Sequence, residues 1–163
     1  MIKGLREYFH ICNIAGRSLV SMPSQVVDVA WHEFILFTKK YEEFCGNAFN
    51  RFLHHTPAEA MLTPKKATIG IKRAWRISCY REKSPPSGSI KLPLLFALDS
   101  QLKIPDGFKY SLNCTNQKNG IYCAGHINLD CGVGFFSDGV SDGCFSDSSG
   151  SDGGSGGCGG GGE

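Results

Sequence analysis

Apolar side chains recur every three or four positions through the first half of the chain, the spacing that gathers them on one face of an α-helix. This pattern predicts a first helix over residues 2–15. A second helix opens after Ser24 and is apolar on nearly every side, so we expect it to be buried over most of its surface. Thr38 either bends that helix or caps the next one.

The third helical pattern is the most regular one. It covers residues 41–52, where apolar residues follow the i, i+3, i+4, i+7 spacing, and we expect His54 and His55 to end this helix. Two Thr-Pro steps follow, each pairing a capping hydroxyl with a proline suited to the first helical position. The second step, at Thr63, predicts a helix that runs to about Arg81.

The second half of the chain reads differently. An apolar run over 92–98 predicts a short helix after Pro93, and residues 105–107 predict a turn. Residues 108–114 and 121–127 resemble short strands. Because Asn-Gly lies directly before the second strand, we expect the two strands to pair as a tight hairpin.

From Cys131 onward the composition is reduced to Gly, Ser, Asp and Cys with few apolar residues, which predicts disorder. The chain therefore divides into a globular domain over 1–130, with its hairpin at 108–130, and a low-complexity tail over 131–163. The expected fold class is mainly α: a small bundle of four to five helices, a short C-terminal β-hairpin and a disordered tail. The expected core contains Trp31, Phe34, Phe44, Phe49, Phe52 and Trp75.

Charge is distributed unevenly. Residues 1–130 carry all 17 Lys and Arg and 10 acids, a net charge of +7, whereas residues 131–163 carry five acids and no base. The N-terminus has no apolar signal-peptide region and no run of about 18 apolar residues occurs, so we expect a cytoplasmic protein without a membrane span. In that compartment the eight cysteines are expected to be reduced thiols.

Four stretches carry a resemblance to a known family: PSQVVDVAWHEFILFTKKYEEFC, RFLHHTPAEAM, LPLLFALDSQL and YCAGHI. Together they resemble bacterial proteins described as glycine-rich domain-containing, whose members extend further before the GLREYF stretch. A weaker resemblance links the chain to the N-terminal domain of plant glycine-rich domain proteins. The resemblance implies no particular activity, and it directs attention to the motif residues Asp28, Trp31, His32, Tyr41, Cys45, His54 and His55.

A first candidate metal site lies within this motif. Asp28 and His32 are four residues apart and share one helix face, to which a helical hairpin could return His54 and His55. Imidazole and carboxylate ligands suit zinc or iron. The competing interpretation is structural, with Asp28 orienting His32 and a later histidine capping helix-end carbonyls.

A second candidate is a structural zinc site formed by Cys114, Cys123, His126 and Cys131, against which stands a set of buried or idle thiols. Cys45 beside a histidine would resemble a nucleophile and its base. Its apolar stripe, however, favours a small core residue.

The predicted helix over 65–81 carries six basic residues on its outer face, a pattern compatible with phosphate contacts and also with a solvated surface. No complete catalytic motif is present, so we predict no catalytic residue. The favoured function is a non-catalytic interaction or scaffold domain that binds a protein partner. The alternatives are a metal-binding protein or metal-dependent enzyme, with zinc as the first candidate, and nucleic-acid binding.

Overall fold

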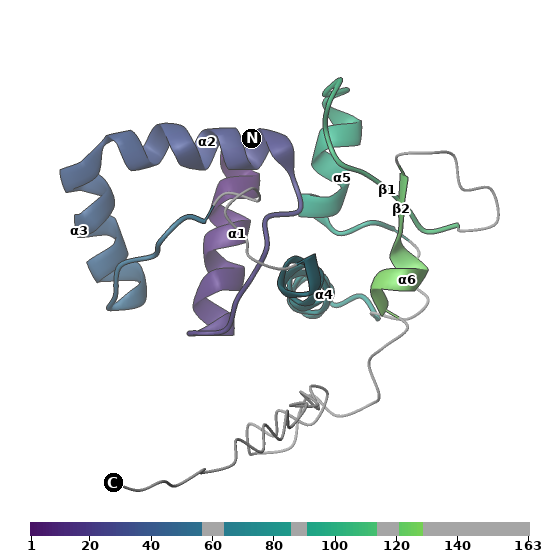
Figure 1. Cartoon of the computed structure of the whole chain (residues 1–163), viewed down its shortest axis with the longest axis horizontal. Helices are drawn as coiled ribbons and strands as arrows, with labels where there is room; N and C mark the ends of the chain where they lie inside the picture. The colour runs from purple at the N-terminus through teal and green to yellow at the C-terminus, as the bar shows by residue number, and fades with distance from the viewer. Residues whose placement is uncertain (57–63, 86–90, 114–120, 129–163) are drawn as a thin grey trace, which may run out of the picture. The chain divides into compact units, whose positions relative to one another are not determined.

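The computed structural model describes residues 1–56, 64–85, 91–113 and 121–128. Its elements follow in the order α1 (Ile2–Ala15), α2 (Gln25–Leu36), α3 (Thr38–Phe49), α4 (Pro64–Arg81), α5 (Leu94–Gln101), β1 (Lys109–Ser111), β2 (Ile121–Cys123) and α6 (Ala124–Asn128) (Figure 1). The mainly α prediction is confirmed. The predicted disordered tail over 131–163 lies outside the described residues.

Helix α1 is the centre of the packing. It contacts α2, α4 and α5, and its buried face contributes several members of the hydrophobic core. Gly4 lies where α1 meets α2 and α5, and a Cβ at this position would overlap the side chains of Val27 and Leu98. A glycine is therefore needed here for close helix approach rather than for a turn.

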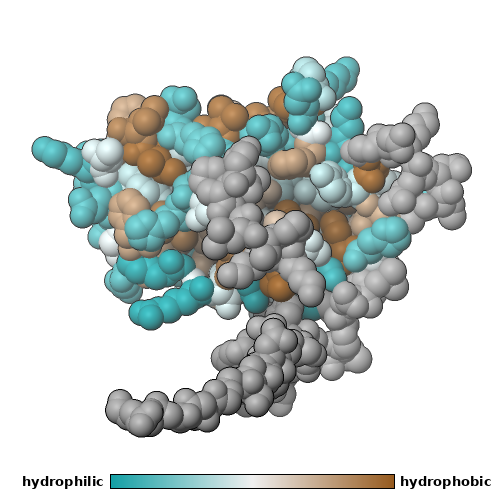
Figure 2. All heavy atoms as spheres, viewed as in Figure 1, coloured by the Kyte–Doolittle hydropathy of each residue, from teal (hydrophilic) through white to brown (hydrophobic). Residues whose placement is uncertain are grey.

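Helices α2 and α3 are two elements that meet at Phe37, so the break expected near Thr38 is confirmed. The expectation that α2 is buried on most sides is wrong. Val29 is 49 % exposed, Leu36 72 % and Phe37 66 %, and Figure 2 shows hydrophobic residues gathered over this part of the surface. Helix α2 packs on α1, α3 and α5, and its exposed side carries His32 and Glu33 beside Val29 and Leu36.

Helix α3 ends earlier than its apolar pattern predicts. Asn50 adopts a left-handed conformation with φ of 51°, and the chain then leaves the helix. Phe52, predicted to be in the core, is 44 % exposed, whereas Trp31 and Trp75 are buried as expected. The prediction that His54 and His55 end a helix is wrong, because both lie in an irregular segment after α3.

Asp99 on α5 fixes the beginning of α2. Its carboxylate is 2 % exposed and accepts from the Ser24 hydroxyl at 2.6 Å and from the Gln25 amide at 2.7 Å. It also accepts from the amides of Val26 at 3.3 Å and Phe108 at 2.9 Å. Because a helix N-terminus presents unpaired N–H groups and a partial positive charge, a buried carboxylate is stabilised there.

The two strands do not form the predicted hairpin. β1 and β2 pair in parallel, with Lys109 opposite Ile121 and Ser111 opposite Cys123. The second predicted strand also ends at Cys123 and continues as the short helix α6. An Asn-Gly pair predicts only a local turn. Whether two strands pair in parallel or antiparallel depends on the path that the chain takes between them. None of the described helices is long and apolar enough to cross a membrane.

Candidate metal centre

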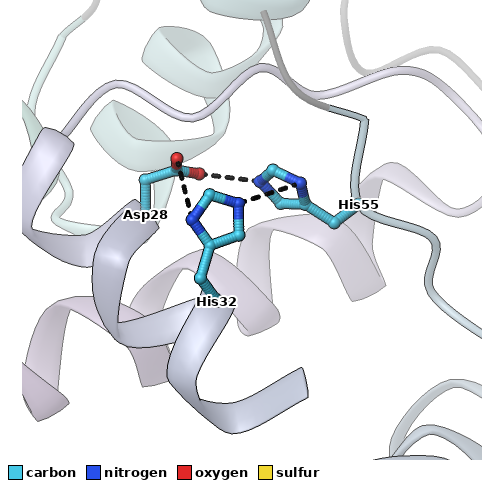
Figure 3. A group of neighbouring side chains, drawn as sticks. All are labelled: Asp28, His32 and His55. Carbon is cyan, nitrogen blue, oxygen red and sulfur yellow. Dashed lines mark hydrogen bonds and ion pairs between the residues drawn. The ribbon is translucent and has the colours of Figure 1, made fainter. Parts of the chain in front are cut away.

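Three side chains converge beside the middle of α2 (Figure 3). The Asp28 Oδ1 atom lies 2.8 Å from His55 Nε2, and His55 Nδ1 lies 3.3 Å from His32 Nε2. His32 Nδ1 and Asp28 Oδ2 are 3.8 Å apart, which closes a triangle. Within the described residues, one potential ligand atom from each side chain lies within 4.8 Å of the other two.

Two of the three residues are positioned by helix geometry alone. Asp28 and His32 are one turn apart on α2, so both side chains project from the same face. The start of that helix is fixed by the Ser24 cap, whose hydroxyl accepts from the Val27 amide at 3.4 Å and donates to Asp99. The first turn therefore has a defined position, and the Asp28–His32 pair follows from it.

A chain of buried hydrogen bonds positions His55. The Trp31 indole Nε1 donates to the Tyr41 hydroxyl at 3.0 Å, and that hydroxyl donates to the Leu53 carbonyl at 2.6 Å. Leu53 lies two residues before His55, so this relay holds the irregular segment against α2. The His55 ring also packs edge-on against Trp31, with the ring centroids 4.5 Å apart. Three motif residues thus form the site and two more support it.

Burial forms a gradient across the site. The side chain of His55 is 10 % exposed, that of Asp28 24 % and that of His32 49 %. His55 is held by packing and by Asp28, whereas His32 faces water over half its surface. The site is therefore open to solvent on the His32 side, where a small ligand or water can reach it.

The three contacts need more N–H donors than two neutral imidazoles provide. Two neutral imidazoles carry one N–H each, which accounts for the His55–Asp28 and His32–His55 contacts. No N–H then remains for His32 Nδ1, which faces Asp28 Oδ2 with its lone pair directed towards a carboxylate. A metal ion bound among the three groups would accept this lone pair.

The donor set fits a divalent transition metal. Two imidazoles and one carboxylate are the protein ligands of many catalytic zinc sites and of non-haem iron(II) centres. Ligands bonded at about 2.0–2.2 Å in a tetrahedral site lie about 3.4 Å from one another. The observed separations of 2.8, 3.3 and 3.8 Å are near that value, but each of the three residues uses a different atom towards each neighbour. With one ligand atom taken from each residue, the three atoms all lie within 4.8 Å of one another.

His54, predicted as a fourth ligand, is not part of the cluster. It is exposed, and its ring packs on Phe52 with the centroids 4.9 Å apart. The structure turns the His55 ring towards Asp28 and leaves the His54 ring outside the cluster. Sequence reasoning had no means of choosing between them.

Cys45 is fully buried on α3, which supports the core interpretation over a nucleophile. The described free cysteines are Cys12, Cys45 and Cys79, and all three are buried. Burial raises the pKa of Cys12 to about 12 and that of Cys79 to about 11. Thiols with such pKa values are protonated near neutral pH and are poor nucleophiles and metal ligands.

The proposed cysteine-rich zinc site is largely outside the described residues, because Cys114 and Cys131 both fall there. Cys123 is buried at the end of β2. His126 lies exposed on α6. The cysteine-rich zinc site therefore stays an untested prediction.

Part of the basic surface of α4 is engaged within the protein. Arg81 forms a two-pronged ion pair with Glu7 of α1, at 2.5 and 3.0 Å, and this pairing raises its pKa. The Arg73 guanidinium donates to the Leu19 carbonyl at 2.5 Å. These two side chains tie α4 to the first 20 residues, which explains part of the basic pattern without nucleic acid. Nucleic-acid binding stays an untested prediction.

Asp99 is the important residue that sequence analysis missed. It is a charge inside the apolar run LLFALDSQ, five of whose residues are buried. A single acid within such a run is the signal that could have identified it, because a buried carboxylate needs several donors. A glycine is also required beside it, since a Cβ on Gly107 would lie 2.6 Å from the Asp99 Cβ.

Comparison with known families places the chain in one of them. The model of the UCP032817-like family matches residues 1–130, so this chain belongs to that family. No curated protein and no solved structure matches the chain. The matched range contains α1 to α6 and every residue of the Asp28–His32–His55 cluster.

Proposed function

We infer that this protein binds one divalent transition-metal ion, zinc or iron(II), through Asp28, His32 and His55. The convergence of these three side chains from two separate segments is the observation that carries the proposal. An exposed cluster of acids gathers easily without a function. Here a nearly buried imidazole has been fixed against a carboxylate by packing and by a hydrogen-bonded relay.

Three protein ligands leave at least one coordination position open, on the exposed His32 side. A structural zinc site is closed by four protein ligands, whereas a site with three keeps a position for water or substrate. A water bound to zinc becomes acidic enough to supply hydroxide near neutral pH. The arrangement therefore favours a metal-dependent hydrolytic or lyase-type reaction over a purely structural metal.

The test is metal content, measured by mass spectrometry on protein purified under reducing conditions without an affinity tag. We expect about one equivalent of metal in the wild-type protein, and its loss in His55→Ala and Asp28→Asn variants. His54→Ala is the matched control, because it removes the same ring one residue away and should keep the metal.

A wild-type protein that neither retains zinc or iron(II) nor takes it up on reconstitution would refute the proposal. Equal loss of metal in the His54→Ala and His55→Ala variants would also count against it. In that case the site would depend on the general fold of the segment rather than on the His55 imidazole.

A second candidate function is a non-catalytic interaction domain. The observation that favours it is the exposure of three apolar residues, Val29 within α2 and Leu36 and Phe37 where α2 meets α3. The likeness to glycine-rich domain-containing proteins belongs to this proposal as well. Leu36→Asp with Phe37→Ser would reduce capture of a protein partner under this function and would leave metal content unchanged.

A further inference from the structure

A cavity of about 360 Å³ lies between α1 and α3, apart from the three metal-ligand side chains. Its apolar floor is formed by Phe9, Phe44, Phe49 and Ala48. Its polar lining comes from one face of α1, from residues spaced i, i+4 and i+7: Arg6, His10 and Asn13. An apolar concavity with a few convergent polar groups is the usual form of a small-molecule site.

The floor is a fixed aromatic surface. Phe9 packs against Phe44 with the ring centroids 4.9 Å apart and against Phe49 at 6.0 Å, and Phe44 and Phe49 are 5.8 Å apart. Each ring therefore contacts the other two, which holds all three in place. Phe9 is buried, while the two rings of α3 are half-buried and contribute the part of the floor that a ligand can cover.

The polar side of the cavity is cationic. Arg6 is exposed, and within the described residues its guanidinium has no carboxylate or carbonyl partner. Glu7, the neighbouring acid, is directed to Arg81 of α4 by two hydrogen bonds and does not neutralise Arg6. Among the described residues that line the cavity none is acidic, so its charge complements an anion.

We propose that this cavity binds a small amphipathic carboxylate, a medium-chain fatty acid anion. The carboxylate pairs with Arg6 on the side of the cavity that His10 and Asn13 also line, and the aliphatic chain covers the phenylalanine floor. A volume of 360 Å³ holds about 12 water molecules at roughly 30 Å³ each, which suits a ligand of about that number of heavy atoms.

Titration calorimetry with decanoate, kept below its micelle-forming concentration, tests the proposal on the full chain. We expect saturable 1:1 binding, with affinity weakened about five-fold or more in Arg6→Gln, because one charge-assisted contact is lost. Arg17→Gln is the matched control: it makes the same substitution at an exposed arginine outside the cavity and should bind as wild type. Decanol, which has the chain without the charge, should bind at least about five-fold more weakly.

Ala48→Leu places extra methylene groups into the cavity and should reduce binding of both decanoate and decanol. Absence of saturable binding to the wild-type protein would overturn the proposal, and so would equal affinity in the Arg6→Gln and Arg17→Gln variants. The His55→Ala variant keeps every cavity residue and should bind decanoate as wild type does. Failure of the metal site and failure of this site are therefore distinguishable.

Discussion

Two carboxylates lie at the first turn of α2, and they have opposite roles. Asp99 reaches the first turn from α5, is 2 % exposed, and accepts four hydrogen bonds from three backbone amides and a hydroxyl. Asp28 belongs to the same first turn, is 24 % exposed, and contacts two imidazoles. The donors around Asp99 cannot leave or change charge, whereas those around Asp28 exchange protons and can turn to a metal.

The difference shows how a structural carboxylate is told from a functional one. Both are charged groups drawn out of water, and both need compensation. Donors from the backbone saturate Asp99 and leave nothing for a ligand. Around Asp28, by contrast, the Oδ2 atom lies 3.8 Å from His32 Nδ1, which is too far for a hydrogen bond. The Asp28 carboxylate is thus only partly hydrogen-bonded, and its partners are imidazoles that can also bind a metal ion. These two features distinguish it from Asp99.

The largest expected effect comes from breaking the saturated site. Asp99→Ala removes the acceptor for one buried and three partly buried donors. Each costs about 1–3 kcal/mol when left unpaired in the interior, and partial exposure with water entry keeps the total near 4 kcal/mol. Urea denaturation followed by circular dichroism measures the loss of unfolding free energy. The matched variant is Asp106→Ala at an exposed acid in the nearby turn, which should change stability by less than about 0.5 kcal/mol. A loss below about 1 kcal/mol for Asp99→Ala would mean that the carboxylate does not hold α2.

Asp28→Asn should change stability little and metal affinity strongly, the reverse of what we expect for Asp99→Ala. Without metal its effect on stability is expected to be below about 1 kcal/mol, because the lost contact is a partly exposed ion pair. Its effect on metal affinity should be about 100-fold or more, since even residues that only support metal ligands cost 10- to 100-fold when changed. Competition against a chromophoric chelator measures the affinity. Retained affinity in this variant, with Asp99→Ala binding poorly, would reverse the roles assigned to the two carboxylates.

Lowering the pH should weaken metal binding at the Asp28 site and leave the hydrogen bonds of Asp99 unchanged. Imidazoles change charge between about pH 5 and 8, and a metal must displace their protons. We therefore expect zinc affinity to fall by at least about ten-fold from pH 7 to pH 5, because protonation of either histidine removes a ligand. The donors to Asp99 do not titrate in this range. Affinity that is constant from pH 7 to pH 5 would exclude both histidines as ligands.

The smallest expected effect tests the relay behind His55. Trp31→Phe keeps an aromatic ring against His55 and removes the indole donor to Tyr41, which should cost about 1 kcal/mol of stability. Metal affinity should fall only a few-fold, because Tyr41 still donates to Leu53. Tyr41→Phe removes both hydrogen bonds and should reduce metal affinity further. If Tyr41→Phe affected affinity no more than Trp31→Phe, the relay would not be what positions His55.

Buried thiols and hydroxyls respond to alkaline pH in a predictable direction. Burial raises the pKa of Cys12 from 9.0 to about 12, so the folded state favours the protonated thiol. That stabilisation is complete below about pH 9 and is lost as the pH rises towards 12. Burial raises the pKa of Tyr41 above its ordinary value as well, so the support of His55 weakens in the same direction.

The helices could be read from the sequence because each depends on neighbours within a few positions. The Thr-Pro step at Thr63 indicated the beginning of α4, and Ser24 indicated the beginning of α2, where its hydroxyl indeed caps the helix. The pairing of Asp28 with His32 needed only the helical repeat. Three of the four residues predicted for this site are brought together, and the fourth, His54, packs on Phe52 outside the cluster.

By itself, the sequence determined the helical class, most helix positions, the i, i+4 pair on α2 and the shortlist of histidines. Tertiary structure alone decided that His55 faces Asp28, that Asp99 caps α2, that the two strands run parallel and that a cavity separates α1 from α3. The Asp28–His55 contact spans 27 residues and the Ser24–Asp99 contact spans 75. Periodicity and capping act over about one helical turn, so they carry no information about contacts at such separations, which depend on how the whole core packs.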